Sequence, residues 1–127
     1  MKAVYDAIWG EWDAHAGLKA VMPALYMTEA PAGATMPYGV YWPVSEIRLD
    51  TFNTNSEEYL IQIDSYANAW NATGILAIQL QVHDCFDWCA LTVAAWNHIY
   101  MKRVSSTLQR EDDCWHAIDT YQLEVQS

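Results

Sequence analysis

The feature that most limits how this chain can fold is the alternation of apolar and polar residues near its end, in residues 115–126, which is the cleanest in the chain. In the run Tyr-Gln-Leu-Glu-Val-Gln at 121–126, every second residue is apolar. Successive side chains of a β-strand point to opposite faces, so this pattern predicts a strand with one buried and one polar face. The chain therefore has to build a sheet that is covered on one side.

Four earlier segments also favour extended structure, because they alternate in the same way or are rich in β-branched and aromatic residues. We expect strands at 21–27, 38–45, 58–66 and 91–108. Pro23 lies in the first of these segments, and proline cannot donate to a sheet ladder, so that strand is expected at an edge. Strands joined by short turns should pair antiparallel.

Two segments have helical periodicity instead. Apolar residues recur every three or four positions in residues 1–15 and again in residues 69–89. Gly17 is the predicted stop of the first helix, and Asn68 or Asn71 is the predicted cap of the second. The two apolar stripes are Val4, Ile8 and Trp12 in the first helix, and Ile75, Ile78, Val82, Cys85 and Cys89 in the second.

The order of these elements is helix, strands, helix, strands, which predicts an α+β fold. We expect one antiparallel or mixed sheet of four to five strands, with two helices packed on one face. A chain of 127 residues can bury one hydrophobic core but not two. A single domain over residues 1–127 is therefore expected.

The charge balance narrows the range of partners. The net charge is −10, and only six residues are Lys or Arg, so the basic stripe that DNA binding requires is missing. Anionic membranes are disfavoured for the same reason, and no apolar run reaches the roughly 20 residues of a membrane span. The early acidic residue Asp6 argues against a secretion signal. We expect a protein that stays in a cytoplasm or leaves it inside a larger particle.

The aromatic content points toward interfaces. The chain has seven Trp and eight Tyr but two Phe. Trp and Tyr combine an apolar body with a polar tip, so they suit half-buried surfaces and subunit contacts. So many Trp side chains are hard to bury in a core of this size, which favours interfaces. The alternative is that the aromatic residues simply form the core and an ordinary surface.

A metal site is the sharpest chemical hypothesis. Cys85 and Cys89 lie four residues apart on one predicted helical face, close enough to share a metal. The spacing matches no zinc motif, however, and a Cys on an apolar stripe behaves as a small hydrophobe. We expect free thiols and no metal or other cofactor, and whether these two residues bind a metal stays open. A metal site would need further ligands, and the candidates are His83, His98, Cys114 and His116.

Catalysis has no positive signal in the sequence. A Cys nucleophile needs an adjacent base, and His83 is two residues from Cys85, which points it elsewhere on a helix. There is no Gly-rich phosphate loop, Gly-x-Ser-x-Gly or His-Glu-x-x-His motif. We therefore expect no catalytic residues and no enzyme.

Two polar segments, 50–57 and 103–113, are expected to be hairpin tips. They are either solvated turns or docking surfaces for neighbouring subunits. On the second interpretation, the predicted interface residues are Asp50, Thr51, Phe52, Asn53, Thr54, Asn55, Arg103 and Arg110.

A series of short motifs in a fixed order is similar to a known family. A Pro-rich connector leads through Met36-Pro37-Tyr38-Gly39-Val40-Tyr41 into a strand, and the later motifs follow in sequence: Tyr59-Leu60-Ile61-Gln62-Ile63, Phe86-Asp87, Met101-Lys102-Arg103, Asp112-Asp113-Cys114-Trp115-His116 and Tyr121-Gln122-Leu123-Glu124-Val125. Over nearly its whole length the chain resembles the tail-completion or tail-terminator proteins of tailed bacteriophages, a head–tail joining type long filed as a domain of unknown function.

The resemblance implies a ring, expected to be a hexamer, that caps the finished tail tube and joins it to the head connector. Its partners would be copies of itself, the tail tube protein and a neck protein, with DNA passing through the lumen without specific binding. It would be assembled in the host bacterial cytoplasm and reside in the virion, at the head–tail junction of the tail.

Three other interpretations remain. The first is a neck adaptor with twelve copies, the second a small zinc- or thiol-dependent enzyme, and the third a monomeric binding module for a small ligand.

Overall fold

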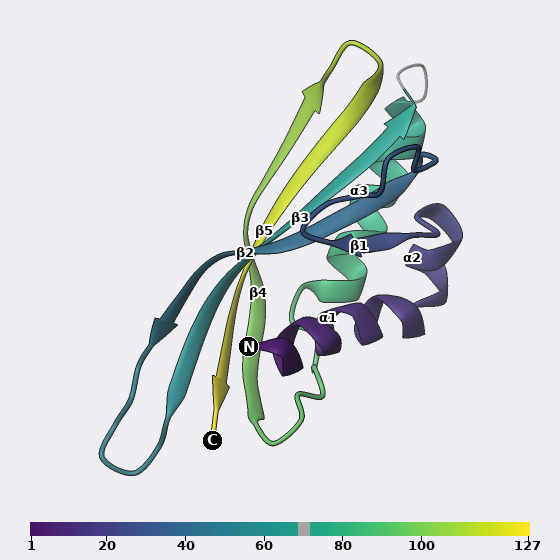
Figure 1. The fold of residues 1–127 in the computed structure, drawn as a ribbon. Helices are drawn as coiled ribbons and strands as arrows, with labels where there is room; N and C mark the ends of the chain where they lie inside the picture. Colours follow the sequence, from purple (N-terminus) through teal and green to yellow (C-terminus); the bar gives the residue numbers. More distant parts are fainter. Residues whose placement is uncertain (69–71) are drawn as a thin grey trace.

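The computed structural model describes residues 1–68 and 72–127. The described residues form three helices and five strands: α1 (Lys2–Ala14), α2 (Ala16–Val21), β1 (Leu25–Met27), β2 (Tyr38–Arg48), β3 (Ser56–Asn68), α3 (Ala72–Phe86), β4 (Asn97–Arg110) and β5 (Cys114–Gln126). The strands make one sheet in the order β1-β2-β3-β5-β4. The β1–β2 pair is parallel and the other pairs are antiparallel. The helices lie on one side of this sheet (Figure 1), which confirms the predicted α+β fold with a mixed sheet.

The two central strands, β3 and β5, carry the alternation that the sequence predicts. Tyr59, Ile61 and Ile63 of β3 are fully buried, as are Tyr121, Leu123 and Val125 of β5. These side chains meet the apolar stripes of α1 and α3 in one core cluster. Intervening residues such as Gln62 and Gln122 are only partly buried, on the face that the helices leave open.

The prediction that Gly17 stops the first helix is wrong, because the helix already breaks at His15. There the backbone becomes extended, with φ −95° and ψ 96°, and the Nδ1 atom of His15 accepts a hydrogen bond from the Leu18 N–H at 2.9 Å. This cap starts α2, a third helix, with Gly17 inside it. A Cβ atom on Gly17 would lie 2.5 Å from Oε1 of Gln81 on α3, so a larger residue would displace that flexible side chain.

The boundaries around the second predicted helix also differ. Helix α3 ends at Phe86 rather than 89, because Trp88 adopts a left-handed φ of 59°. Strand β4 begins at Asn97 rather than 91, because Ala95 has a φ of 65° and closes a turn. Asn68 is the last residue of β3 and not a helix cap, and the alternative cap, Asn71, lies outside the described residues.

The sheet has two incompletely covered edges. The predicted 21–27 strand shortens to β1, which confirms its edge position but pairs only with residues 39–41 of β2. The rest of β2 continues with β3 as a hairpin arm, and β4 and β5 project as a second hairpin at the other end of the molecule (Figure 1). The two hairpins extend well beyond the helices.

Candidate assembly interface

The β2–β3 hairpin carries exposed apolar side chains where it leaves the core. We call residues 44–58 the arm. Its exposed large apolar residues are Val44, Ile47, Leu49 and Phe52, and the Phe52 side chain at the tip is fully solvent-accessible. Single apolar residues are common on protein surfaces, but a row of them on a projecting hairpin is typical of a binding surface. The sequence prediction had included only Phe52 among them.

The arm tip is ordered by its own hydrogen bonds. The N–H of Thr51 donates to the carbonyl of Thr54 at 2.9 Å, and their hydroxyl oxygens are 2.7 Å apart. Asp50 pairs with Arg48 at 2.5 Å and accepts from the N–H of Ser56 at 3.3 Å. The predicted interface residues 50–55 therefore form one preorganised tip, which would lose little conformational entropy on binding.

The outer edge of β2 is free along the arm. Because β1 ends opposite Tyr41, no strand lies beside residues 42–48 in the part of the chain that the structure describes. Pro43 occupies this edge and is followed by a register shift before Ser45. A free strand edge presents unpaired N–H and C=O groups to a partner.

Strand β4 is the opposite edge of the sheet. The turn after α3 covers its middle: the carbonyl of Met101 accepts from the N–H of Trp88 at 2.7 Å, and the N–H of Arg103 donates to Asp87 at 2.9 Å. Residues 104–110 then continue without another strand outside them among the described residues. We call residues 102–110 the β4 edge, and it exposes Val104 and Leu108.

The basic residues on this edge differ from those in the rest of the chain in their ion pairing. Lys2, Lys19 and Arg48 each form an ion pair with an aspartate. Lys102, Arg103 and Arg110 take part in none of the ion pairs found among the described residues. The β4 edge also contains no Asp or Glu. It is a locally basic strip on an acidic protein, a feature that the sequence prediction included only through Arg103 and Arg110.

The structure thus places the predicted interface residues at two separate sites. Residues 50–55 lie together at the arm tip, whereas Arg103 and Arg110 lie on the β4 edge across the sheet. The prediction that 103–113 is a hairpin tip is wrong for 103–110, which belong to β4, because the strand pairing with β5 continues to Arg110. Within one copy the two groups do not meet. The exposed face of α3 adds a third apolar surface, formed by Leu76 and Leu80, which the sequence analysis did not identify.

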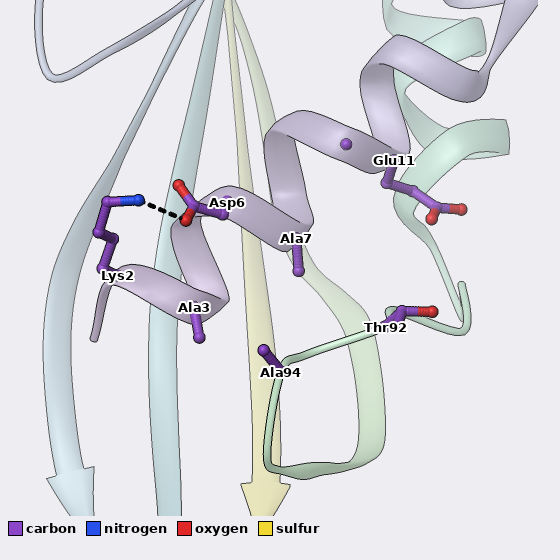
Figure 2. Close-up of a pocket in the computed structure, with 8 residues that line it drawn as sticks. Lys2, Ala3, Asp6, Ala7, Glu11, Thr92 and Ala94 are labelled. Carbon is purple, nitrogen blue, oxygen red and sulfur yellow. Dashed lines mark hydrogen bonds and ion pairs between the residues drawn. The ribbon is translucent and has the colours of Figure 1, made fainter.

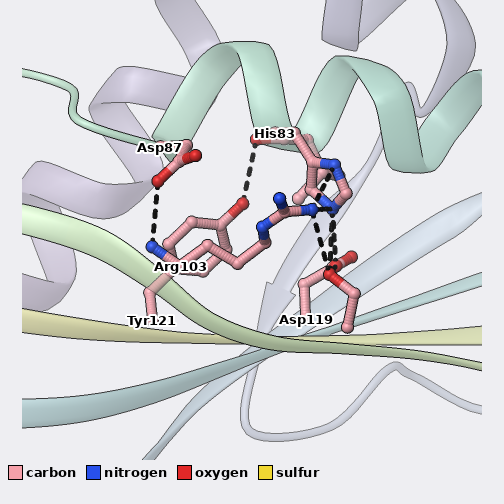
Figure 3. Close-up of polar contacts among 7 residues, drawn as sticks. His83, Asp87, Arg103, Asp119 and Tyr121 are labelled. Atoms are coloured by element: carbon pink, nitrogen blue, oxygen red, sulfur yellow. Dashed lines mark hydrogen bonds and ion pairs between the residues drawn. The ribbon is translucent and has the colours of Figure 1, made fainter.

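Arg103 belongs to a polar cluster that joins α3 to β4 and β5 (Figure 3). Its Nη1 lies 2.9 Å from Nδ1 of His83, and Nε2 of His83 lies 2.8 Å from Oδ1 of Asp119. The hydroxyl of Ser106 donates to the same Oδ1 at 2.6 Å. Asp119 is fully buried, and His83 and Ser106 supply contacts to one of its two oxygens, Oδ1. No local sequence signal marks this cluster, because its members come from three distant elements.

The same cluster contains Ser, His and Asp but lacks the geometry of a catalytic triad. In a triad the histidine stands between the hydroxyl and the carboxylate, using one ring nitrogen for each. Here Ser106 donates directly to Asp119, and the Nε2 atom of His83 faces both of them, at 3.2 and 2.8 Å. The arrangement is typical of structural hydrogen bonds that hold α3 against the sheet.

The other residues considered as metal ligands do not come together in one site. Burial raises the pKa of the Cys89 thiol to about 12 and that of Cys85 still further, so both favour the neutral form that neither attacks nor binds metals well. Nε2 of His98 lies 2.9 Å from the carbonyl oxygen of Cys89, and His116 contacts Glu111 at 2.8 Å. Among the described residues, no three His, Cys, Asp or Glu side chains are grouped to hold a metal ion.

An open groove of about 550 Å³ runs between α1 and the loop before β4 (Figure 2). Lys2 and Asp6 form an ion pair at its rim, 2.7 Å apart, and Glu11 and Thr92 supply its other polar side chains. The remaining lining is Ala3, Ala7, Gly10 and Ala94. The groove is wide and lined by small side chains, so it lacks the converging polar groups of a specific ligand site.

In the described part of the chain, no helix has the length and apolar character needed to cross a bilayer.

The fold is similar to that of a chain in the virion of a native gene transfer agent (GTA) particle. The TM-score is 0.83 at 14% sequence identity, and the match covers 96% of this chain and 93% of that chain. At this identity the likeness establishes a shared fold. No protein-family model and no curated protein matches the sequence.

Proposed function

We propose that this chain is a structural protein of a phage-like virion. The observation that carries the proposal is the fold shared with a chain of a gene transfer agent virion, over nearly the full length of both chains. Two extended hairpins with exposed apolar residues support it, because such surfaces are typical of proteins that function in assemblies. We further propose that the chain has no catalytic activity of its own.

Within the virion, we propose the role of a tail-completion protein. A hexameric ring would cap the finished tail tube, stop its growth and offer a docking face to the head connector. The motif resemblance from Pro37 to Val125 suggests this role, and the free edges of β2 and β4 are consistent with a ring of copies. The protein would then reside at the head–tail junction.

The ring would also form part of the DNA channel. Each copy carries a net charge of −10, so a lumen lined by acidic side chains would repel DNA and let it pass without specific binding. The proposal requires the carboxylates to face the lumen, and a ring structure with these groups on its outer wall would contradict it.

Electron microscopy of the purified protein mixed with tail tubes from its own particle tests the role. We expect a ring at one end of each tube and no further addition of tube protein beyond it. Binding along the tube wall, or no binding, would contradict tail completion.

The neck adaptor is the second candidate, because it also requires a ring with exposed strand edges. Native mass spectrometry of the assembled particle separates the two. Six copies support tail completion, and twelve copies that bind the portal side support the adaptor.

A further inference from the structure

We propose that copies of this chain associate head to tail through two different surfaces, with the β4 edge of one copy bound to the arm of the next. The inference rests on the proposed function only in assuming that the partner is a second copy. It assigns the two surfaces that form the contact, and it follows from charge, free backbone and exposed apolar residues.

Charge makes the two surfaces complementary. The β4 edge has Lys102, Arg103 and Arg110 and no acidic residue. The arm has four carboxylates, those of Glu46, Asp50, Glu57 and Glu58, against the single basic residue Arg48. Arg103 is turned toward His83 and Ser106, and Arg110 donates to the carbonyl of Glu111. Among the described residues, neither Lys102 nor Arg110 forms an ion pair with a carboxylate, so both charges can be paired by a partner. The arm thus offers a basic strip a group of carboxylates with apolar neighbours, although Glu46 is paired with the N-terminal amine and Asp50 with Arg48 within the same copy.

The backbone is complementary as well. Residues 104–110 of β4 and residues 42–48 of β2 are free edges of equal length on opposite sides of the same sheet. Placing one beside the other continues the sheet from copy to copy, with main-chain hydrogen bonds supplying affinity. In a pair formed this way, one copy keeps a free β2 edge and the other keeps a free β4 edge, so further copies can be added at both ends.

Apolar side chains accompany both edges. Val104 and Leu108 are exposed on the β4 edge, and Ile47, Leu49 and Phe52 are exposed on the arm. Burying these side chains against one another would remove from water the large apolar residues that both projecting hairpins expose.

The same charges disfavour a two-fold symmetric contact between like surfaces. Pairing β4 with β4 would bring Lys102 of one copy toward Arg110 of the other, and pairing arm with arm would set carboxylates near carboxylates. Like charges placed together across an interface are strongly unfavourable. Because the β4 edge and the arm lie on opposite edges of the sheet, a single two-fold contact cannot use both of them reciprocally. The contact is therefore heterologous, and a heterologous contact closes into a ring when its rotation permits.

Two variants with one disabled surface each test the contact. The edge variant Lys102→Glu/Arg110→Glu reverses the charge of the β4 edge. The arm variant Ile47→Ser/Phe52→Ala removes exposed apolar groups from the arm. A control, Lys2→Glu/Lys19→Glu, makes the same change in net charge on α1 and α2. Circular dichroism and thermal unfolding establish that all three remain folded.

Sedimentation velocity over a concentration series gives the readout. We expect the wild type and the control to assemble and each variant alone to stay monomeric. An equimolar mixture of the two variants should form a 1:1 heterodimer that grows no further, because the mixture has one intact edge and one intact arm. This complementation distinguishes the proposed contact from a two-fold contact between like surfaces, which cannot produce it.

Several outcomes would overturn the contact: assembly of either variant like the wild type, a mixture that stays monomeric, or a wild type that does not self-associate up to its solubility limit. Rings that cap tail tubes but tolerate both variants would leave the proposed function standing and the contact refuted. Self-assembly with the predicted complementation but no tube binding would refute the function and leave the contact standing.

Discussion

Asp119 is the residue on which the connection between α3 and the edge of the sheet depends. Its carboxylate is fully buried, and Oδ2 has no hydrogen-bond partner among the described residues. The other oxygen accepts from the hydroxyl of Ser106 at 2.6 Å and lies 2.8 Å from Nε2 of His83. With one oxygen already unpaired, losing a donor at the other is expected to be costly.

Ser106→Ala tests this dependence. A hydrogen bond to a charged group contributes about 1.5–3 kcal/mol, so we expect the free energy of unfolding to fall by an amount in that range. Ser106 is exposed, so lost packing adds little. Ser105→Ala is the matched control, because the hydroxyl of Ser105 has no hydrogen bond shown in the described structure. Surface changes of this kind alter the free energy of unfolding by no more than about 0.5 kcal/mol. Equal urea-denaturation midpoints for both variants would contradict the role of Ser106.

The cysteine thiols give a pH prediction. Burial raises the pKa of Cys89 from its ordinary 9.0 to about 12, and that of Cys85 moves in the same direction. Above pH 9 the unfolded chain loses thiol protons that the folded chain retains. The unfolded state then binds fewer protons, so stability falls as pH rises. Stability should be fully present below pH 9 and decline between pH 9 and 12.

Urea denaturation across this pH range provides the measurement. Partly buried tyrosines such as Tyr66, whose pKa desolvation raises to about 12, add a decline of the same sign. The variant Cys89→Ala isolates the thiol contribution and should show a shallower decline than the wild type. Parallel curves for the two proteins would show that Cys89 does not contribute.

At the scale of elements, the sequence predicted best those strands whose environment is one-sided. Strands β3 and β5 are buried mainly on the helix face, so their alternation reports their orientation directly. The turns at Trp88 and Ala95 use left-handed backbone at residues that are not glycine. No local signal marks such positions, because tertiary contacts impose them. The ends of α3 and β4 were therefore misplaced.

The candidate interface was predictable only in part, for a related reason. Polar residues 50–55 mark a hairpin tip in the sequence, and the structure confirms a loop there. Apolar residues such as Ile47 and Val104 look like core positions in a strand pattern. Only the three-dimensional structure shows that they are exposed, because the helices do not cover this part of the sheet. Whether the tip and these residues bind another subunit stays a prediction.

Replacing residues 50–55 with Asn-Gly tests the tip as an element. This dipeptide favours the tight two-residue turn that suits a hairpin. Most of the hydrogen bonds of the tip are internal or lie between Asp50 and its neighbours, so the shortened protein should fold as a monomer. We expect it to lose self-association, as measured by sedimentation velocity. Assembly at the same concentration as the wild type would rule out the tip as part of the subunit contact.

At the scale of the whole molecule, two electrostatic effects oppose each other during assembly. Every copy carries a net charge of −10, which repels other copies at long range. The proposed contact between the β4 edge and the arm brings opposite charges together at short range. Salt screens both effects, but it screens the long-range repulsion at lower concentrations than the short-range attraction. Charges interact over about the Debye length, which is about 30 Å at 0.01 M salt and about 10 Å at 0.1 M.

This difference predicts a maximum in self-association as the salt concentration rises. Near 0.01 M the long-range repulsion is unscreened and should weaken assembly, and near 0.1 M it is largely removed while contacts within a few ångströms persist. Toward 1 M the Debye length falls to about 3 Å, so the attraction at Lys102 and Arg110 should weaken too. The variant Lys102→Glu/Arg110→Glu lacks that attraction, so any residual association should only rise with salt. Sedimentation velocity on both proteins across this range tests the prediction, and a wild-type curve that rises steadily to 1 M would mean that opposite charges do not hold the copies together.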